Sequence, residues 1–128
     1  MSTNQVISTA QIEIFDEENV RIGYLKKEDV LSYKNTRQDV VYIDAATAGP
    51  PLVPVTKSLN LITSTIEYIV IYAYNDVKIV INGSITELPA KGSFILSGSE
   101  ITSVDIINEN TTEVKLEIIQ GDELVSGD

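Results

Sequence analysis

The stretch that most constrains this chain is residues 65–88, TIEYIVIYAYNDVKIVINGSITEL, where apolar side chains occupy both faces of a strand-like run. Side chains in a strand alternate between two faces, so positions two apart lie together. A strand that is apolar on both faces needs cover on both, from its own domain or from another subunit. We therefore expect a central strand here. One of its faces would carry Tyr68, Val70, Tyr72 and Tyr74.

An Asn-Gly pair at Asn82 and Gly83 separates two β-branched runs, residues 77–81 and 85–88. A type I′ turn needs positive φ at both central residues, and Asn-Gly meets that need at little cost. The pattern predicts a tight hairpin in which the second strand resumes at once. Asn and Asp at residues 75–76 predict an earlier break in the chain.

The second half of the chain has a regular rhythm, with strand-like runs that begin every 8 to 11 residues. Such spacing is typical of an antiparallel sandwich or small barrel and not of βαβ units. We expect an all-β, single-domain antiparallel β-sandwich (jelly-roll-like or Ig-like) over residues 1–128. It would have an extended N-terminal segment and a short polar C-terminal tail. Turns are expected at residues 89–92, 97–100 and 108–112, and the tail at 121–128.

The first half follows the strand pattern less regularly. Residues 6–15 and 20–25 are interpreted as strands joined by an acidic turn at residues 16–19. A solvated turn explains those acids better than a calcium site, because the spacing of a calcium loop is absent. Residues 26–34 allow at most one short helix. Paired prolines within residues 46–54 cannot donate to a sheet ladder, so that segment is predicted to be a loop or an extended segment along a sheet edge.

Composition excludes several classes of chemistry. The 128 residues contain no cysteine and no histidine, and the formal net charge is −10. The commonest general base and the usual transition-metal ligands are therefore missing. No phosphate loop or nucleophile elbow occurs, so we expect no enzyme activity, no cofactor and no metal site.

Partners are constrained by the same composition. The acidic surface repels phosphate backbones, which argues against nucleic acid as a partner. No run of about eighteen apolar residues would cross a membrane as a helix, and the polar residues 1–5 predict no signal peptide.

The candidate site is therefore an interface. Tyr68, Tyr72 and Tyr74 form a row on one face of the central strand, which we call the tyrosine row. Tyrosine combines apolar area with a polar tip and is enriched at interfaces, so the row is interpreted as core or subunit contact in preference to a sugar-stacking platform. Apolar residues of the proline-rich loop are candidates for packing against the sandwich or a neighbouring subunit. The candidate interface residues are Tyr68, Val70, Tyr72, Tyr74, Leu52 and Val53.

Four successive segments of the second half are considered together as a set. They are LPAKGSFILSG at residues 88–98, ITSVDI at 101–106, the Asn-rich turn at Asn108, and VKLEIIQG at 114–121. Together they resemble small all-β virion proteins of tailed bacteriophages. The resemblance implies a non-enzymatic structural protein of the virion, a capsid decoration or other accessory protein. Its implied partners are other virion proteins, the major capsid protein among them, and further copies of itself, with a trimer as one option.

An alternative reading of the chain is a carbohydrate-binding or adhesion module, for example part of a fibre or host-attachment apparatus. It would use a face of the sandwich or its loops, and its best platform would be the tyrosine row.

Overall fold

The computed structural model describes residues 4–125, and within that range the chain forms seven β-strands and no helix. Every strand pairing is antiparallel, so the predicted all-β antiparallel fold is confirmed. Since the described range has no helix, it has none that is long and apolar enough to cross a membrane. The strands are β1 (Asn4–Phe15), β2 (Arg21–Ile43), β3 (Val55–Ser58), β4 (Ile66–Ile81), β5 (Leu88–Ile101), β6 (Val104–Asn108) and β7 (Val114–Val125).

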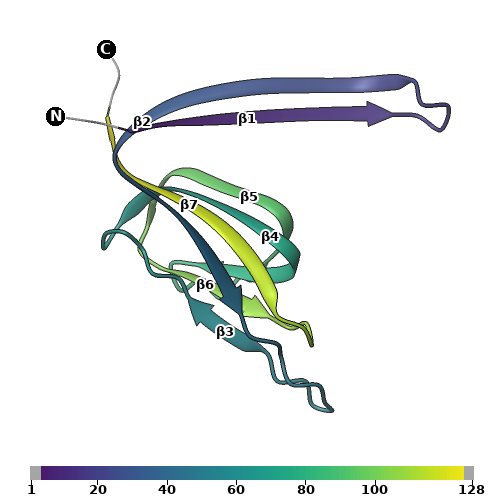
Figure 1. The fold of residues 1–128 in the computed structure, drawn as a ribbon, viewed down its shortest axis with the longest axis vertical. Helices are drawn as coiled ribbons and strands as arrows, with labels where there is room; N and C mark the ends of the chain where they lie inside the picture. Colours follow the sequence, from purple (N-terminus) through teal and green to yellow (C-terminus); the bar gives the residue numbers. More distant parts are fainter. Residues whose placement is uncertain (1–3, 126–128) are drawn as a thin grey trace.

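The strands follow the order β1-β2-β7-β4-β6-β3, and β5 pairs with β4 outside that path. The body is sandwich-like because β4 changes partners along its length (Figure 1). Its first half pairs with β7, and its second half pairs with β6. A register shift between Ala73 and Val77 separates the two halves, so residues 74–76 bulge out of the ladder. The expected break at residues 75–76 is thus a bulge within one continuous strand, since backbone pairing resumes directly after it.

The core lies between the two layers. β4 contributes Ile69, Ile71 and Ala73, each at most 2% exposed, and this confirms the predicted central strand. Further residues of β4 and residues from β2, β5, β6 and β7 complete the cluster. Its other members are Ile43, Ile66, Val77, Ile79, Ile101, Val104, Ile106, Val114, Leu116 and Ile118.

The Asn-Gly turn has the predicted backbone and joins an antiparallel hairpin of β4 and β5, but the connection is longer than the predicted tight turn. Asn82 and Gly83 both have positive φ, 54° and 66°. The next strand resumes only at Leu88, and Ile85 is fully exposed in the connection. The Asn82 side chain explains the longer loop, because its Oδ1 accepts a hydrogen bond from the Thr102 amide at 2.7 Å. The turn is therefore tied to the β5–β6 connection.

β5 is longer than expected because glycines bend it without ending it. The turns expected at residues 89–92 and 97–100 are wrong, since both segments lie inside this strand. Gly92 and Gly98 have φ of 77° and 79°, a backbone conformation that glycine adopts without a Cβ clash. The turn expected at 108–112 does connect β6 to β7.

The short helix that the sequence allowed at residues 26–34 does not form, and the polar tail expected from residue 121 is wrong for its first part. Residues 26–34 form no helix; they belong to β2, whose backbone pairs with β1 and then with β7. Residues 121–125 form no polar tail; they complete β7, and Gly121 and Asp122 are buried. Residues 1–3 and 126–128, the ends of the expected terminal segments, lie outside the described residues.

Candidate functional site

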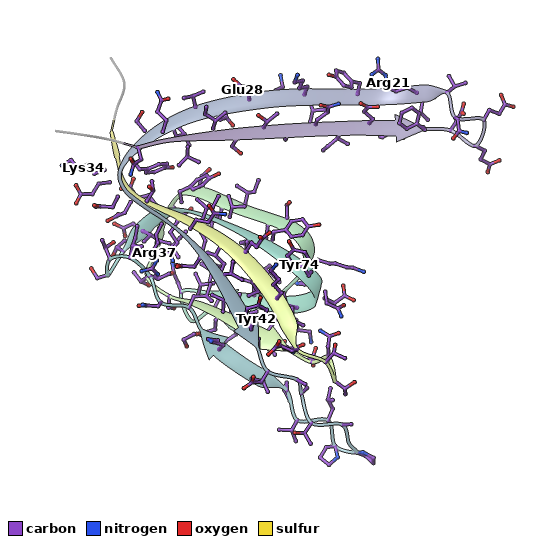
Figure 2. The ribbon with its side chains drawn as sticks, in the orientation of Figure 1. Arg21, Glu28, Lys34, Arg37, Tyr42 and Tyr74 are labelled. Carbon is purple, nitrogen blue, oxygen red and sulfur yellow. The ribbon has the colours of Figure 1, made fainter. Side chains whose placement is uncertain are left out.

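The feature that stands apart from the body is a two-stranded ribbon (Figure 1). It consists of β1, the turn after it and β2 as far as residue 31, and we call residues 4–31 the arm. β1 pairs with β2 alone, and β2 begins to pair with β7 only at Ser32. Figure 2 shows Arg21 and Glu28 on the arm, away from the sheet that carries Tyr42 and Tyr74.

Both faces of the arm carry exposed apolar side chains. Ile12 pairs with Leu25 on one face, and Ile7 pairs with Val30 on the other. Every residue from 9 to 30 except Gly23 is exposed. The large apolar side chains exposed on the arm are Ile7, Ile12, Ile14, Phe15, Val20, Ile22, Tyr24, Leu25 and Val30.

The tip of the arm is an acidic turn in which backbone amides donate hydrogen bonds to the Asp16 side chain. The Asp16 carboxylate accepts hydrogen bonds from the amides of Glu18, at 2.9 Å, and Val20, at 3.0 Å. Asn19 has a positive φ of 64°, which closes the turn. The predicted solvated turn is therefore confirmed. Across residues 4–125 no group of three or more acidic side chains is arranged to hold a metal ion.

The base of the arm is fixed by an aromatic contact. Tyr33 is 1% exposed, and its ring centroid lies 5.6 Å from that of Tyr68, which is 2% exposed. Gly121 lies beneath Tyr33, where an added Cβ would come within 3.0 Å of the ring. Burial raises the pKa of Tyr33 above its usual value, and the nearby Tyr68 and Glu67 raise it further. The contact therefore favours the neutral phenol.

The second exposed surface is the side of the sheet that faces away from the core. One row across four strands joins Val40, Glu117, Tyr72 and Ser93, and a second row includes Val70 and its neighbours. We call this surface the outer face. It consists of Val40, Tyr42, Val70, Tyr72, Tyr74, Ser93, Ile95, Lys115, Glu117 and Ile119.

Aromatic side chains dominate the outer face. Tyr72 and Tyr74 are 43% and 50% exposed, and their rings meet edge to face at 5.0 Å. The Tyr74 hydroxyl donates a hydrogen bond of 2.7 Å to Glu117, which raises the pKa of this phenol. The Lys115 ammonium lies 5.0 Å from the Tyr74 ring centroid. These contacts orient the rings and leave their apolar area open.

The structure brings together half of the residues predicted for the interface. Val70, Tyr72 and Tyr74 share the outer face, whereas Tyr68 is buried under the base of the arm. Leu52 and Val53 are exposed on a separate loop, whose predicted irregular backbone is confirmed. Backbone hydrogen bonds of 2.9 Å between Thr47 and Val53 close that loop.

Sequence reasoning missed several surface residues. Tyr42 and Ile95 belong to the outer face, and their period-two patterns marked the strands without showing which side lacked cover. The sequence pattern divided the arm into strands at residues 6–15 and 20–25 and a segment from residue 26 that allowed a short helix. Its signal was the apolar alternation on either side of the acidic turn, which matches the observed pairing of β1 with β2.

A charged cluster elsewhere in the body has a structural role. The Lys78 ammonium lies 2.9 Å from Glu109 and 3.5 Å from Glu87, beside an open hollow. Its hydrogen bond with Glu109 is the largest of the effects that raise its pKa. A catalytic lysine needs a lowered pKa so that its amine is free to react. Lys78 is instead held as a cation.

The arm and the outer face thus offer exposed apolar and aromatic area, on the arm interspersed with charged side chains, a surface suited to binding another macromolecule. No protein-family model matches the chain, and no curated protein sequence matches it.

Proposed function

We propose that this protein is a non-enzymatic structural protein of a virion, which associates with copies of itself and binds the assembled capsid shell. The observation that carries the proposal is the arm. An isolated two-stranded ribbon is marginally stable in water, yet this one exposes nine large apolar side chains. Packing against another molecule would bury them and stabilise the ribbon.

Charge and resemblance support the virion as the setting. The body, residues 34–125, holds six Lys and Arg against twelve Asp and Glu, a formal charge of −6. Such a surface suits the outside of a DNA-filled shell, because packaged phosphates would repel it. The resemblance to small all-β virion proteins points the same way. A protein that binds the lattice but not separate subunits would stabilise the lattice by mass action.

Cosedimentation with purified shells tests this function. Wild type should pellet with assembled shells and stay in solution with separated capsid subunits. An arm variant, Ile12→Asp with Tyr24→Asp, places one charge on each face of the arm and should pellet poorly. Ile85→Asp with Thr86→Asp adds the same charge in an exposed loop and should behave as wild type. A protein that binds no shells and is absent from particles would overturn the proposal.

The outer face supports a second candidate, a carbohydrate-binding or adhesion module. Tyr42, Tyr72 and Tyr74 are each roughly half exposed, and Glu117 lies among them as a hydrogen-bond acceptor. Exposed rings beside a carboxylate suit stacking against a sugar and bonding to its hydroxyls. A glycan array with wild type and Tyr72→Ala tests it. Binding that Tyr72→Ala abolishes would support this candidate, and a blank array with wild type would eliminate it.

A further inference from the structure

We infer that the arm of one copy packs on the outer face of a second copy. The inference deepens the proposed function by naming what the arm binds. It rests on the arm being an assembly element, and it does not depend on the virion being the setting.

The first argument is where the exposed apolar surface lies. In the described part of the chain, eighteen large apolar side chains are exposed, and nine of them are on the arm. Five more, Val40, Tyr42, Tyr72, Tyr74 and Ile95, are on the outer face. Two surfaces therefore hold fourteen of the eighteen, a concentration typical of interfaces and not of scattered surface residues. A second copy supplies both surfaces at once.

A single copy leaves both surfaces uncovered. The arm meets the outer face only at its base, where Gln5 and Val6 line an open hollow with Gln38 and Ile119. Beyond that point the ribbon continues away from the sheet (Figure 1). The contact between Tyr33 and Tyr68 fixes this departure. The outer face of each copy is thus open to an arm from elsewhere.

The length of the arm is sufficient to span the outer face. β1 has 12 residues, which at about 3.4 Å per residue gives an arm of roughly 40 Å. Four strands spaced about 4.8 Å apart make an outer face roughly 20 Å wide, so the arm is long enough to cross it. The nine exposed apolar side chains are divided between the two faces of the arm, so one face supplies only part of the roughly 800 Å² per partner that a stable interface buries. The polar side chains of the same face would supply the rest.

Charge also favours this pairing. The two strands of the arm carry Arg21, Lys26 and Lys27 against Glu13, Glu28 and Asp29, so the ribbon behind the tip is neutral. Two bodies, each with a formal charge of −6, repel each other. With its acidic tip included, the arm carries three Lys and Arg against six Asp and Glu, a formal charge of −3, so it approaches such a body at a lower electrostatic cost than a second body does. Contact between an arm and a body is therefore favoured over contact between two bodies.

Because all copies of the chain are identical, each copy can both give its arm to another copy and receive an arm. If each copy gives its arm and receives one, two copies form a closed dimer, and a larger ring forms when the rotation differs. Either arrangement places every arm on the outer face of a partner. The two-faced arm then packs one apolar face on the partner's sheet, about 10 Å away as in stacked sheets.

Complementation between two full-length variants tests the inference. The arm variant, Ile12→Asp with Tyr24→Asp, keeps an intact outer face. The face variant, Tyr72→Asp, keeps an intact arm, and Ile95→Asp serves as a second face variant should Tyr72→Asp fail to fold. Native mass spectrometry distinguishes the chains by mass, and circular dichroism checks that each is folded. Ile85→Asp with Thr86→Asp is the charge-matched control.

The expected pattern is specific. Wild type and the control form oligomers, and each variant alone is monomeric. The mixture forms a heterodimer that contains one copy of each variant. Its affinity is lower than that of wild type, because only one arm still meets an intact face. A mixture that stays monomeric while wild type is oligomeric would overturn the inference, and so would a monomeric wild type.

Failure here is distinguishable from failure of the proposed function. Wild type that pellets with shells as a monomer would overturn the pairing between copies but keep the virion role. Complementation without any binding to shells would establish the pairing and remove the virion role.

Discussion

At the scale of single residues, Tyr33 decides where the arm begins. Its ring fills the space over Gly121 and contacts Tyr68, so three positions far apart in sequence form one joint. The sequence pattern placed Tyr68 in an interface row and Tyr33 in a segment that allowed a short helix. Alternation showed that Tyr68 shares a face with Tyr72, but it gave no sign that another ring covers Tyr68 alone.

Gly121→Ala tests this joint. The added Cβ would come within 3.0 Å of the Tyr33 ring, so the substitution should lower the free energy of unfolding by about 1–3 kcal/mol, as overpacking does. In a Tyr33→Leu background the ring is absent, so Gly121→Ala should lower the free energy of unfolding by less. Urea unfolding of the four proteins in this cycle measures the coupling. Equal costs in both backgrounds would show that Tyr33 does not pack on Gly121.

Tyr33 also predicts how stability depends on pH. Burial raises the pKa of its phenol in the folded state. The phenol therefore contributes fully to the free energy of unfolding below its pKa in the unfolded chain, about 10, and this contribution is lost as pH rises through its pKa in the folded protein. Stability should therefore fall at alkaline pH, and less steeply in Tyr33→Phe. Urea unfolding at several values between about pH 8 and about pH 11 compares the two proteins. Parallel curves would contradict this assignment.

At the scale of elements, the arm shows what periodicity predicts and what it does not. Apolar alternation and the acidic residues at 16–19 predicted a strand, a turn and a second strand, and these exist. The exposure of both faces was not predictable, because alternation tells which side chains lie together and not whether anything covers them. The sequence left residues 26–34 open to a short helix because clustered charges hide the strand period. Pairing with β1 and then with β7 extends the strand through them.

Hydrogen exchange tests the arm as an element. In dilute protein its amides should exchange faster than those of β4, which pairs on both sides within the body. Raising the protein concentration should slow exchange in the arm, because association covers the ribbon, and leave β4 unchanged. Exchange followed by mass spectrometry at two concentrations measures this. Arm amides that are equally protected at both concentrations would contradict association through the arm.

At the scale of the whole molecule, charge sets how copies approach. The acidic bodies repel one another, while the apolar surfaces attract. Added salt screens the repulsion and leaves apolar contact in place, so the dissociation constant of the oligomer should fall as salt rises. Sedimentation velocity at low and moderate salt measures it. Weaker association in salt would instead indicate an interface held by ion pairs.

The overall fold was more predictable than the site. Strand spacing after residue 65 predicted an antiparallel all-β protein, and the central strand forms its core. The site depends on surfaces that lack cover, which is a property of the folded arrangement. Val70, Tyr72 and Tyr74 were placed together correctly by their period, whereas Leu52 and Val53 were grouped with them on composition alone and lie on a separate loop.

Cross-linking between two populations tests the central claim most directly. The chain has no cysteine, so Thr9→Cys on the arm and Ser93→Cys on the outer face each add one unique thiol. We expect mixing them, one isotope-labelled, with a short bifunctional thiol cross-linker to give a Thr9–Ser93 product between copies. Thr86→Cys, in the exposed loop, replaces Ser93→Cys as the control and should give little. Equal yields with Ser93→Cys and Thr86→Cys would contradict the claim that the arm of one copy lies on the outer face of another.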